Sequence, residues 1–422
     1  MRRAPTVEAS HAGGPWRASM LLSAPHRLCF FWAGVQWALS ALWWAAFVLA
    51  QALGFAWPWQ LSPSVAHGLW FGLGAMPLFI AGFFFTAGPK WLRRPPVDAR
   101  GLRAAVASFT LGWVLAVAGV HVDLRLAAAG LGLAGLGLGL LAGRALRLVA
   151  GRTQRERLHA GVIAAALVVM AACLAGSSLA LAWQRPQALP VLLRLGLWWG
   201  VVVVFLAASQ RLLPFFGAGA WVWLDRRWPD WPLWLLASVP LVHGAVAASG
   251  VGGSLAARAL LAAHLALVAA VSLRLSLRWW GEPALRQGLV RMLFVALLWW
   301  DAALCLGAAA WWPGLAPSIA SRLGAAALHA LTLGYLGGTM LAMVTRVSAT
   351  HSGRARAIDG VARVLHALLQ TAVLARVAAA LWPASAWLLL PLAALAWLAV
   401  ALSWALRHGR WLGQPRVDGR PG

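Results

Sequence analysis

Residues 321–356, SRLGAAALHALTLGYLGGTMLAMVTRVSATHSGRAR, join a helix-length apolar run to a polar, basic end. The run contains His329, and the polar end contains Arg346, His351 and Arg354. An apolar stretch of about 20 residues is long enough to cross a bilayer. An ionisable side chain inside such a span is costly, so it usually faces a cavity, a cofactor or another polar group. His329 is therefore a candidate functional residue, and the alternative is a packed histidine that hydrogen-bonds to a neighbouring helix.

Composition places the whole chain in the membrane class. Of its 422 residues 62% are hydrophobic and 11% charged, and the mean hydropathy is +0.76. Soluble domains are far more polar. The formal net charge of +25 would suggest nucleic acid in a soluble protein. Here the charges lie between apolar runs, so the partner that they indicate is the lipid bilayer and not nucleic acid.

Twelve apolar runs are long enough to span a membrane. They cover residues 28–50, 66–88, 104–121, 124–143, 160–182, 191–208, 232–249, 254–272, 288–310, 322–343, 361–381 and 386–405. The fourth run is rich in glycine, which membrane helices tolerate where their backbones pack closely. The sequence therefore predicts an all-α, polytopic transmembrane bundle of about twelve spans.

The distribution of lysine and arginine predicts the orientation of this bundle. Alternate loops and the two terminal segments hold 29 of the 35 basic residues. The other six lie in or near the opposite loops: Arg125, Arg185, Arg194, Arg258, Arg322 and Arg376. The positive-inside rule then predicts that both termini are cytoplasmic. The predicted organisation is a cytoplasmic segment (1–27), a helical membrane domain (28–406) and a basic cytoplasmic tail (407–422).

Several features narrow the location and exclude whole classes of protein. Arginine strongly exceeds lysine, and alanine, glycine and leucine are abundant, which is typical of a bacterium with a GC-rich genome and hence of a multi-pass protein of the cytoplasmic (inner) membrane. The three cysteines are far apart and predict no disulfide framework. Nucleotide-binding and zinc signatures are absent, and the loops are too short for a soluble domain.

Five histidines are predicted near the periplasmic side or in mid-membrane. His67 and His329 share the pattern His-x-Leu-x-x-Gly and a similar depth, and the other three are His121, His243 and His264. A haem iron or a copper ion in a helical bundle needs imidazoles from two or more facing helices. His67 and His329 are the first candidates for such ligands, and His243 is a further metal candidate. The alternative for two or three of the five is an interfacial or packed histidine.

Three distinctive segments end spans two, six and ten on the predicted cytoplasmic face. They read FFFTAGPKW, SQRLLPFF and MVTRVSATHSGR. We expect Arg211, Arg346 and Arg354 to anchor an anionic group such as a haem propionate, because guanidinium binds carboxylates in a bidentate fork. His351 is a candidate ligand in the same place. The alternatives are basic helix ends in solvent and a histidine that hydrogen-bonds to the backbone.

Taken together, these segments resemble the NnrS family of bacterial haem- and copper-containing membrane proteins. The family's Ala-Gly-Phe-Leu-Leu-Thr-Ala-x-Pro-x-Trp segment is matched by Ala81, Gly82, Phe83, Thr86, Ala87, Pro89 and Trp91. Its Arg-x-x-Pro-Phe-Phe element is matched by Arg211, Pro214, Phe215 and Phe216. Its segment around the tenth span is matched by His329, Ala330, Leu331, Thr332, Gly334, Arg346, Val347, His351, Gly353 and Arg354. The matches occur in the family's order.

The resemblance implies an inner-membrane protein of the nitric oxide and nitrosative-stress response, associated with denitrification. It implies haem and copper as cofactors and nitric oxide or a related small molecule as the ligand. It carries over neither a reaction, nor catalytic residues, nor an electron-transfer partner. This chain also departs from the family pattern, because residues 65–69 read Val-Ala-His-Gly-Leu where His-Ala-His-Glu-Met is common. One histidine and one glutamate are therefore missing beside His67, which bears on copper more than on haem.

Two other functions fit the same composition. A small-molecule transporter would suit twelve helices, but such folds carry repeats in equivalent halves. The His-x-Leu-x-x-Gly pattern is the repeat found here, and it does not fall at equivalent spans of two halves. Intramembrane acids are also few, with Asp301 the main one. The third possibility is a haem-free assembly or interaction protein, which the lost ligands favour.

Overall fold

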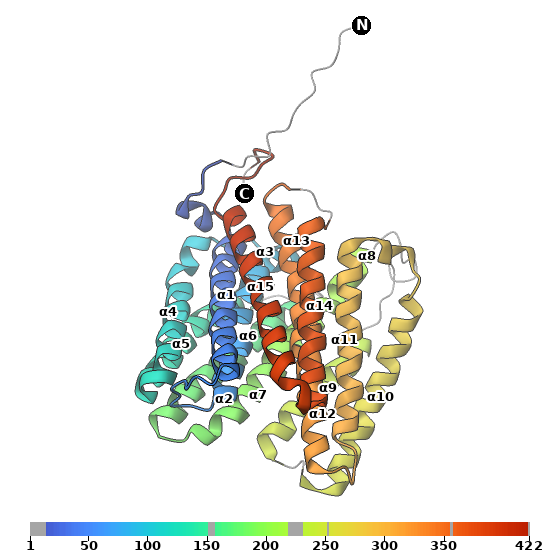
Figure 1. The fold of residues 1–422 in the computed structure, drawn as a ribbon. Coiled ribbons are helices and arrows are strands. Elements are labelled where there is room, and N and C mark those ends of the chain that lie inside the picture. The colour runs from blue at the N-terminus through green and yellow to red at the C-terminus, as the bar shows by residue number, and fades with distance from the viewer. Residues whose placement is uncertain (1–13, 151–156, 218–230, 251–252, 355–357, 421–422) are drawn as a thin grey trace.

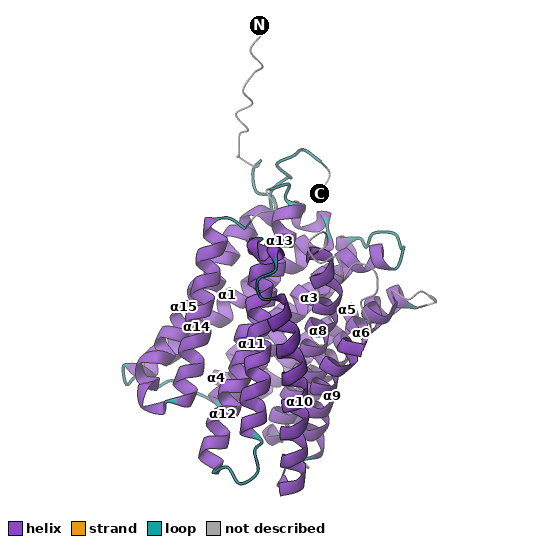
Figure 2. Ribbon diagram, turned by 90° about the vertical axis from the view of Figure 1, so that its right-hand side faces the viewer, coloured by secondary structure: helices purple, strands orange, loops and turns teal. Residues whose placement is uncertain are grey.

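The protein is a bundle of long helices. The computed structural model describes residues 14–150, 157–217, 231–250, 253–354 and 358–420, with the backbone alone for 211–217. Within these ranges the regular elements are all helices, as Figure 2 shows. Twelve of the helical stretches are long and apolar enough to cross a membrane. The predicted number of spans is confirmed, and most helices extend a few residues beyond the predicted apolar runs.

Nine spans are described as a single main helix each: α1 (Pro25–Ala52), α4 (Arg103–Val122), α5 (Leu124–Val149), α6 (Arg157–Ala182), α9 (Trp231–Ser249), α10 (Leu255–Trp279), α11 (Gly288–Ala310), α14 (Gly360–Leu381) and α15 (Ala386–Leu412). The second, sixth and tenth spans are each interrupted by a π-helical segment. They consist of α2 (Pro63–Trp70), η2 (Phe71–Ala75) and α3 (Met76–Trp91); α7 (Leu189–Leu195), η5 (Gly196–Val202) and α8 (Val203–Gly217); and α12 (Pro317–His329), η8 (Ala330–Gly337) and α13 (Gly338–His351).

The glycine-rich fourth span, α5, packs against α4 as its composition predicted. A side chain at Gly130 would place its Cβ 2.3 Å from the backbone nitrogen of Ala116, and one at Gly112 would lie 2.3 Å from that of Ala134. Only hydrogen fits at these two points, because the opposing atoms belong to the other helix's backbone. The glycines therefore allow two backbones to touch, as in other closely packed membrane helices.

Consecutive spans pack against one another, and α15 returns to pack along α1, as Figure 1 shows for the blue and red helices. The second span packs on the sixth through α2, α7 and the two π segments. The sixth reaches the tenth through a hydrogen bond of 3.2 Å between the Ser209 and Tyr335 hydroxyls. The three π-containing spans therefore lie at the centre of the bundle.

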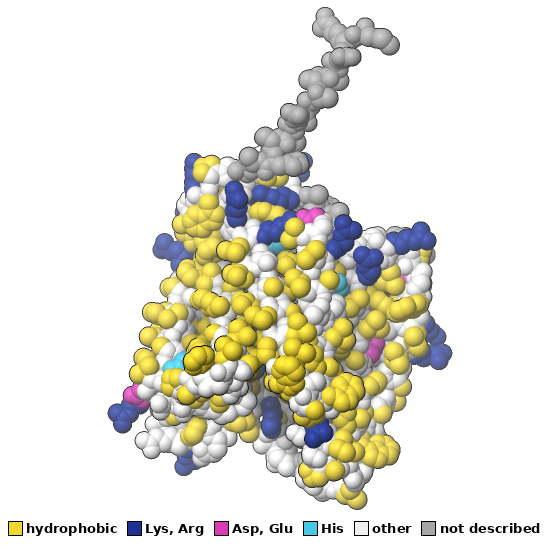
Figure 3. All heavy atoms as spheres, in the orientation of Figure 1, with side chains coloured by type: hydrophobic (Ala, Val, Ile, Leu, Met, Phe, Trp, Pro, Cys, Tyr) yellow, Lys and Arg dark blue, Asp and Glu magenta, His cyan; other side chains and the backbone are white. Residues whose placement is uncertain are grey.

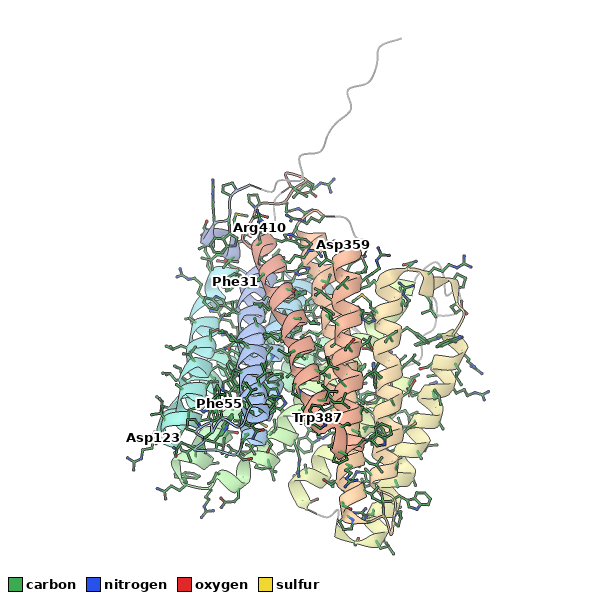
Figure 4. The ribbon with its side chains drawn as sticks, in the orientation of Figure 1. Phe31, Phe55, Asp123, Asp359, Trp387 and Arg410 are labelled. Carbon is green, nitrogen blue, oxygen red and sulfur yellow. The ribbon has the colours of Figure 1, made fainter. Side chains whose placement is uncertain are left out.

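Both ends of the helical domain lie on one face, here called the terminal face. The backbone N–H of Arg17 donates to the Gly413 carbonyl at 2.8 Å, which ties the segment before α1 to the end of α15. In Figure 4 Asp359 and Arg410 lie at this face, and Phe55, Asp123 and Trp387 lie at the opposite end. Figure 3 shows basic side chains gathered at the terminal face above a broad hydrophobic belt. That this face is cytoplasmic stays a prediction from the charge distribution.

Candidate functional site

His67 and His329 lie together near the face opposite the termini. His67 is in the last turn of α2, and His329 is the last residue of α12, so each is followed closely by a π segment. The two imidazoles interact electrostatically with each other, and both interact with the guanidinium of Arg376 in α14. π segments shift the register of the helix that contains them and are frequent at functional sites. The structure thus brings together two residues that are 262 positions apart in the sequence.

Two aromatic side chains pack against the ring of His67. Trp44 of α1 stacks on it with ring centroids 4.0 Å apart and planes inclined by 28°, and Phe71 lies at 4.2 Å. The Nδ1 atom of His67 is buried and has no hydrogen-bond partner. A buried polar atom without a partner is costly and calls for a water, an ion or a ligand.

The tautomer of His329 is set by its own helix. Its Nδ1 lies 2.8 Å from the carbonyl oxygen of Ala325. A carbonyl can only accept, so Nδ1 carries the hydrogen and, in the neutral ring, Nε2 has a free lone pair. A hydrogen bond from the second ring nitrogen to a backbone carbonyl is the usual support of a metal-ligating histidine. His329 is therefore oriented as a ligand would be.

Arg376 was not predicted at this site. In the sequence it is one of six basic residues near the opposite loops, where an arginine usually anchors a helix end. The structure instead places it half-buried on α14, within electrostatic range of both imidazoles. The available signal was a lone cation in an apolar span, which normally indicates a functional partner.

The other histidines near this face fall into two groups. His121 uses both ring nitrogens, because Nδ1 donates to the Pro58 carbonyl at 2.7 Å and Nε2 accepts from the Trp43 indole at 2.8 Å. It is therefore a structural residue. His243 stacks on Trp198 at 4.6 Å and interacts electrostatically with His264.

His243 and His264 each keep one buried nitrogen without a partner, Nε2 and Nδ1 respectively. His264 uses its other nitrogen, Nε2, which lies 2.8 Å from the Ser238 hydroxyl. Among the described residues no three His, Cys, Asp or Glu side chains group as a metal site.

The residues predicted for the cytoplasmic face lie at the terminal face. The ring of His351, at the end of α13, lies 4.3 Å from that of His26 in α1, which the sequence had not singled out. Arg354 donates to the side-chain oxygen of Gln414 at 3.2 Å and lies 4.6 Å over the Trp411 ring. Arg346 is partly buried near the end of the same span as His351. The side chain of Arg211 lies outside the described residues.

Two acidic side chains at this face, Asp359 and Asp418, are paired with arginines. Asp359 receives two hydrogen bonds from Arg407, and this contact lowers the pKa of its carboxyl to about 2. Arg416 likewise donates twice to Asp418, at 2.9 and 2.6 Å.

Burial lowers the pKa of the Arg354 guanidinium, and neighbouring Arg407 and Arg410 lower it further. The terminal face is therefore a strongly cationic region in which these two carboxylates are already engaged.

The two histidine clusters are separated by most of the membrane. His329 and His351 are 22 residues apart on one continuous span. At about 1.5 Å per residue this corresponds to about 30 Å. One haem cannot contact both clusters, because its ring and propionates extend over about half that length.

Nearly the whole chain matches one known protein family. The sequence model of a family described as "NnrS protein" matches residues 20–416. The chain belongs to the NnrS family. Searches of curated proteins and of solved structures each returned no match. Family membership and the twelve-helix apolar bundle fit a multi-pass membrane protein of the nitric oxide response.

Proposed function

We propose that this NnrS-family protein is a haem protein of the bacterial inner membrane that protects against or processes nitric oxide. His67 and His329, from spans two and ten, are the residues that would hold its iron. The observation that carries the proposal is the pair itself: two partly buried imidazoles that interact electrostatically across the bundle, with a buried nitrogen on His67 that no protein group satisfies.

The residues around the pair suit this role. Histidine-held haem iron supplies a site for electron transfer and for binding diatomic gases. The Ala325 carbonyl orients the His329 ring, and Trp44 and Phe71 hold the His67 ring and keep water from it. Arg376 supplies a positive charge beside both imidazoles, which suits a propionate carboxylate.

Copper has weaker support. His243 and His264 would hold such an ion, since each keeps one unpartnered nitrogen. Two ligands are fewer than biological copper sites use, and no third His, Cys, Asp or Glu joins them within the described residues. Haem at the His67/His329 pair is therefore the cofactor that we propose.

The test is the absorption spectrum of the purified full-length protein. Wild type should show a Soret band that shifts on reduction and again when nitric oxide is added. His67→Ala and His329→Ala should each lose or shift this band at equal protein concentration. The matched control is His121→Ala, because His121 lies toward the same face but uses both nitrogens within the protein.

A chemical rescue separates ligation from folding. His67→Gly leaves a space the size of the ring, and added imidazole should restore the wild-type spectrum if His67 binds iron. A wild-type spectrum in both alanine variants would refute the ligand assignment. A purified wild-type protein without any haem band after expression with excess haem would refute the proposed cofactor.

A further inference from the structure

The terminal face contains a second buried site, made where the start of α1 meets the ends of α3 and α13. His26 and Arg27 come from α1, Lys90 from α3 and His351 from α13. His26 and His351 interact electrostatically with each other, and each interacts with Arg27, Lys90 and Arg416. Spans one, two and ten and the C-terminal tail therefore converge on one small region.

Two side chains of this site are almost completely buried and not fully satisfied. His26 and Arg27 are each 1% exposed. Arg27 donates through Nη1 to the carbonyls of Leu412 and Gln414, at 2.8 and 2.7 Å, which leaves Nε and Nη2 without partners. Nε2 of His26 is also buried and unpartnered. A buried guanidinium with free N–H groups is strongly unfavourable unless an acceptor reaches it.

Among the residues that the structure describes, no carboxylate pairs with Arg27 or Lys90. The described ion pairs at this face join Asp359 to Arg407 and Asp418 to Arg416. Neither acid forms an ion pair with Arg27 or Lys90 in the described part of the chain. Arg27 and Lys90 are therefore two cations beside two imidazoles, and no described carboxylate neutralises them. Such a site favours an anion and disfavours a metal cation.

We propose that the His26/His351 site binds a compact oxyanion group between Arg27, Lys90 and the two imidazoles. At least two oxygens are needed, because the free Arg27 nitrogens and the Lys90 ammonium are separate donors. Charge-assisted hydrogen bonds of this kind are shorter and stronger than neutral ones. A free anion such as nitrite or phosphate has this chemistry, and so has a cofactor's carboxylate.

The site does not depend on haem at the His67/His329 pair, which lies about 30 Å away along the tenth span. A haem held there cannot place its propionates here. The two proposals can therefore fail separately: His329→Ala should change the haem spectrum and leave anion binding at the terminal face unchanged.

The experiment compares Lys90→Gln with wild type and with Arg363→Gln, in the purified full-length protein. Lys90 is exposed and its loss should not affect folding, whereas Arg27 also bonds two carbonyls that hold the tail. Arg363 is an exposed arginine near the start of α14 and serves as the charge-matched control. One arm titrates nitrite and inorganic phosphate by calorimetry, and the other measures haem per protein.

A free oxyanion predicts measurable binding that Lys90→Gln weakens about tenfold, the effect of one charge-assisted hydrogen bond, while Arg363→Gln does not. A carboxylate of a second haem, bound beside this site and not at the His67/His329 pair, predicts no titratable anion and a lower haem content in Lys90→Gln alone. His26→Gln should show the same defect as Lys90→Gln, either weaker anion binding or a lower haem content. The proposal is overturned if Lys90→Gln and Arg363→Gln behave alike in both arms.

Discussion

Replacing Gly130 with alanine should force α4 and α5 apart. The added Cβ would lie 2.3 Å from the Ala116 nitrogen, 2.6 Å from the Gly112 carbonyl oxygen and 2.7 Å from the Ala116 Cα. Carbon atoms pack at about 3.5–4.0 Å, so the first of these contacts is too short by more than about 1 Å. All three opposing atoms are backbone, so rotation of a side chain cannot relieve the overlap.

The size of the effect follows from that geometry. Overpacking of a well-packed core costs about 1–3 kcal/mol, and rigid backbone places this case at about 3 kcal/mol. Gly139 lies on the same helix, and a Cβ added there would meet no other atom within 4 Å. Alanine at that position should stabilise α5 by about 0.5–1 kcal/mol, because glycine is the poorer helix former. The gain in helix propensity is the same in both variants, so they should differ by about 3 kcal/mol, the cost of the overlap at Gly130.

The assay is unfolding of the purified protein by SDS in mixed micelles, followed by far-ultraviolet circular dichroism. Gly130→Ala and Gly139→Ala have the same composition, so detergent binding and helix propensity cancel to first order. The midpoint for Gly130→Ala should fall below wild type, and that for Gly139→Ala should match or exceed it. Equal midpoints for the two variants would refute the argument that Gly130 is a point of backbone contact.

Three further predictions concern charged residues. Arg376→Gln should lower haem retention, because the substitution removes the cation beside the His67/His329 pair. Retention is measured as the Soret-to-protein absorbance ratio at equal protein yield. Unchanged retention would exclude Arg376 as a propionate partner. The pKa of Asp359, about 2, lies below the unfolded value of about 3.9, so its pairing with Arg407 stabilises the fold above about pH 4 and is lost as the pH falls to about 2. Asp359→Asn should keep the α14 cap and remove the part of the unfolding free energy that is lost in acid. That part is under about 1 kcal/mol because the pair is exposed. It is measured as the change in unfolding midpoint from about pH 5 to about pH 2. Asp301→Ala should lower the free energy of unfolding in SDS by about 1–3 kcal/mol, because the buried carboxylate accepts hydrogen bonds from two α10 serines at 2.5 and 2.6 Å. Equal losses in Asp301→Ala and Asp301→Asn would contradict this.

Span number was predictable because hydropathy reports the length of apolar helices directly. The close packing of the glycine-rich α5 was also predictable, since small residues in a membrane helix let the backbones of neighbouring helices approach each other. The ends of the spans were predicted less accurately than their number. The tenth helix continues from the apolar run through Arg346 to His351, because polar side chains at a membrane surface do not end a helix.

The candidate sites were predictable in part. The shared pattern around His67 and His329 singled out two residues that the structure brings together. Arg376, His26 and Arg27 were missed, because a charge near a predicted loop is usually an interfacial anchor. Their burial depends on which helix packs against them, and that information is tertiary. The π segments were missed because they leave no periodic signal in an apolar run.

The internal repeat explains why the proposed ligand pair comes from spans two and ten. The pattern does not relate two halves of the chain. Three similar copies of it occur instead, one in each of the second, sixth and tenth spans. Residues 67–72 read His-Gly-Leu-Trp-Phe-Gly, residues 195–200 read Leu-Gly-Leu-Trp-Trp-Gly and residues 329–334 read His-Ala-Leu-Thr-Leu-Gly. All three copies overlap a π segment, and the copy in span six has leucine where the others have histidine. Spans two and ten therefore each carry an imidazole at this position, and these are the two imidazoles that we propose would hold the haem iron.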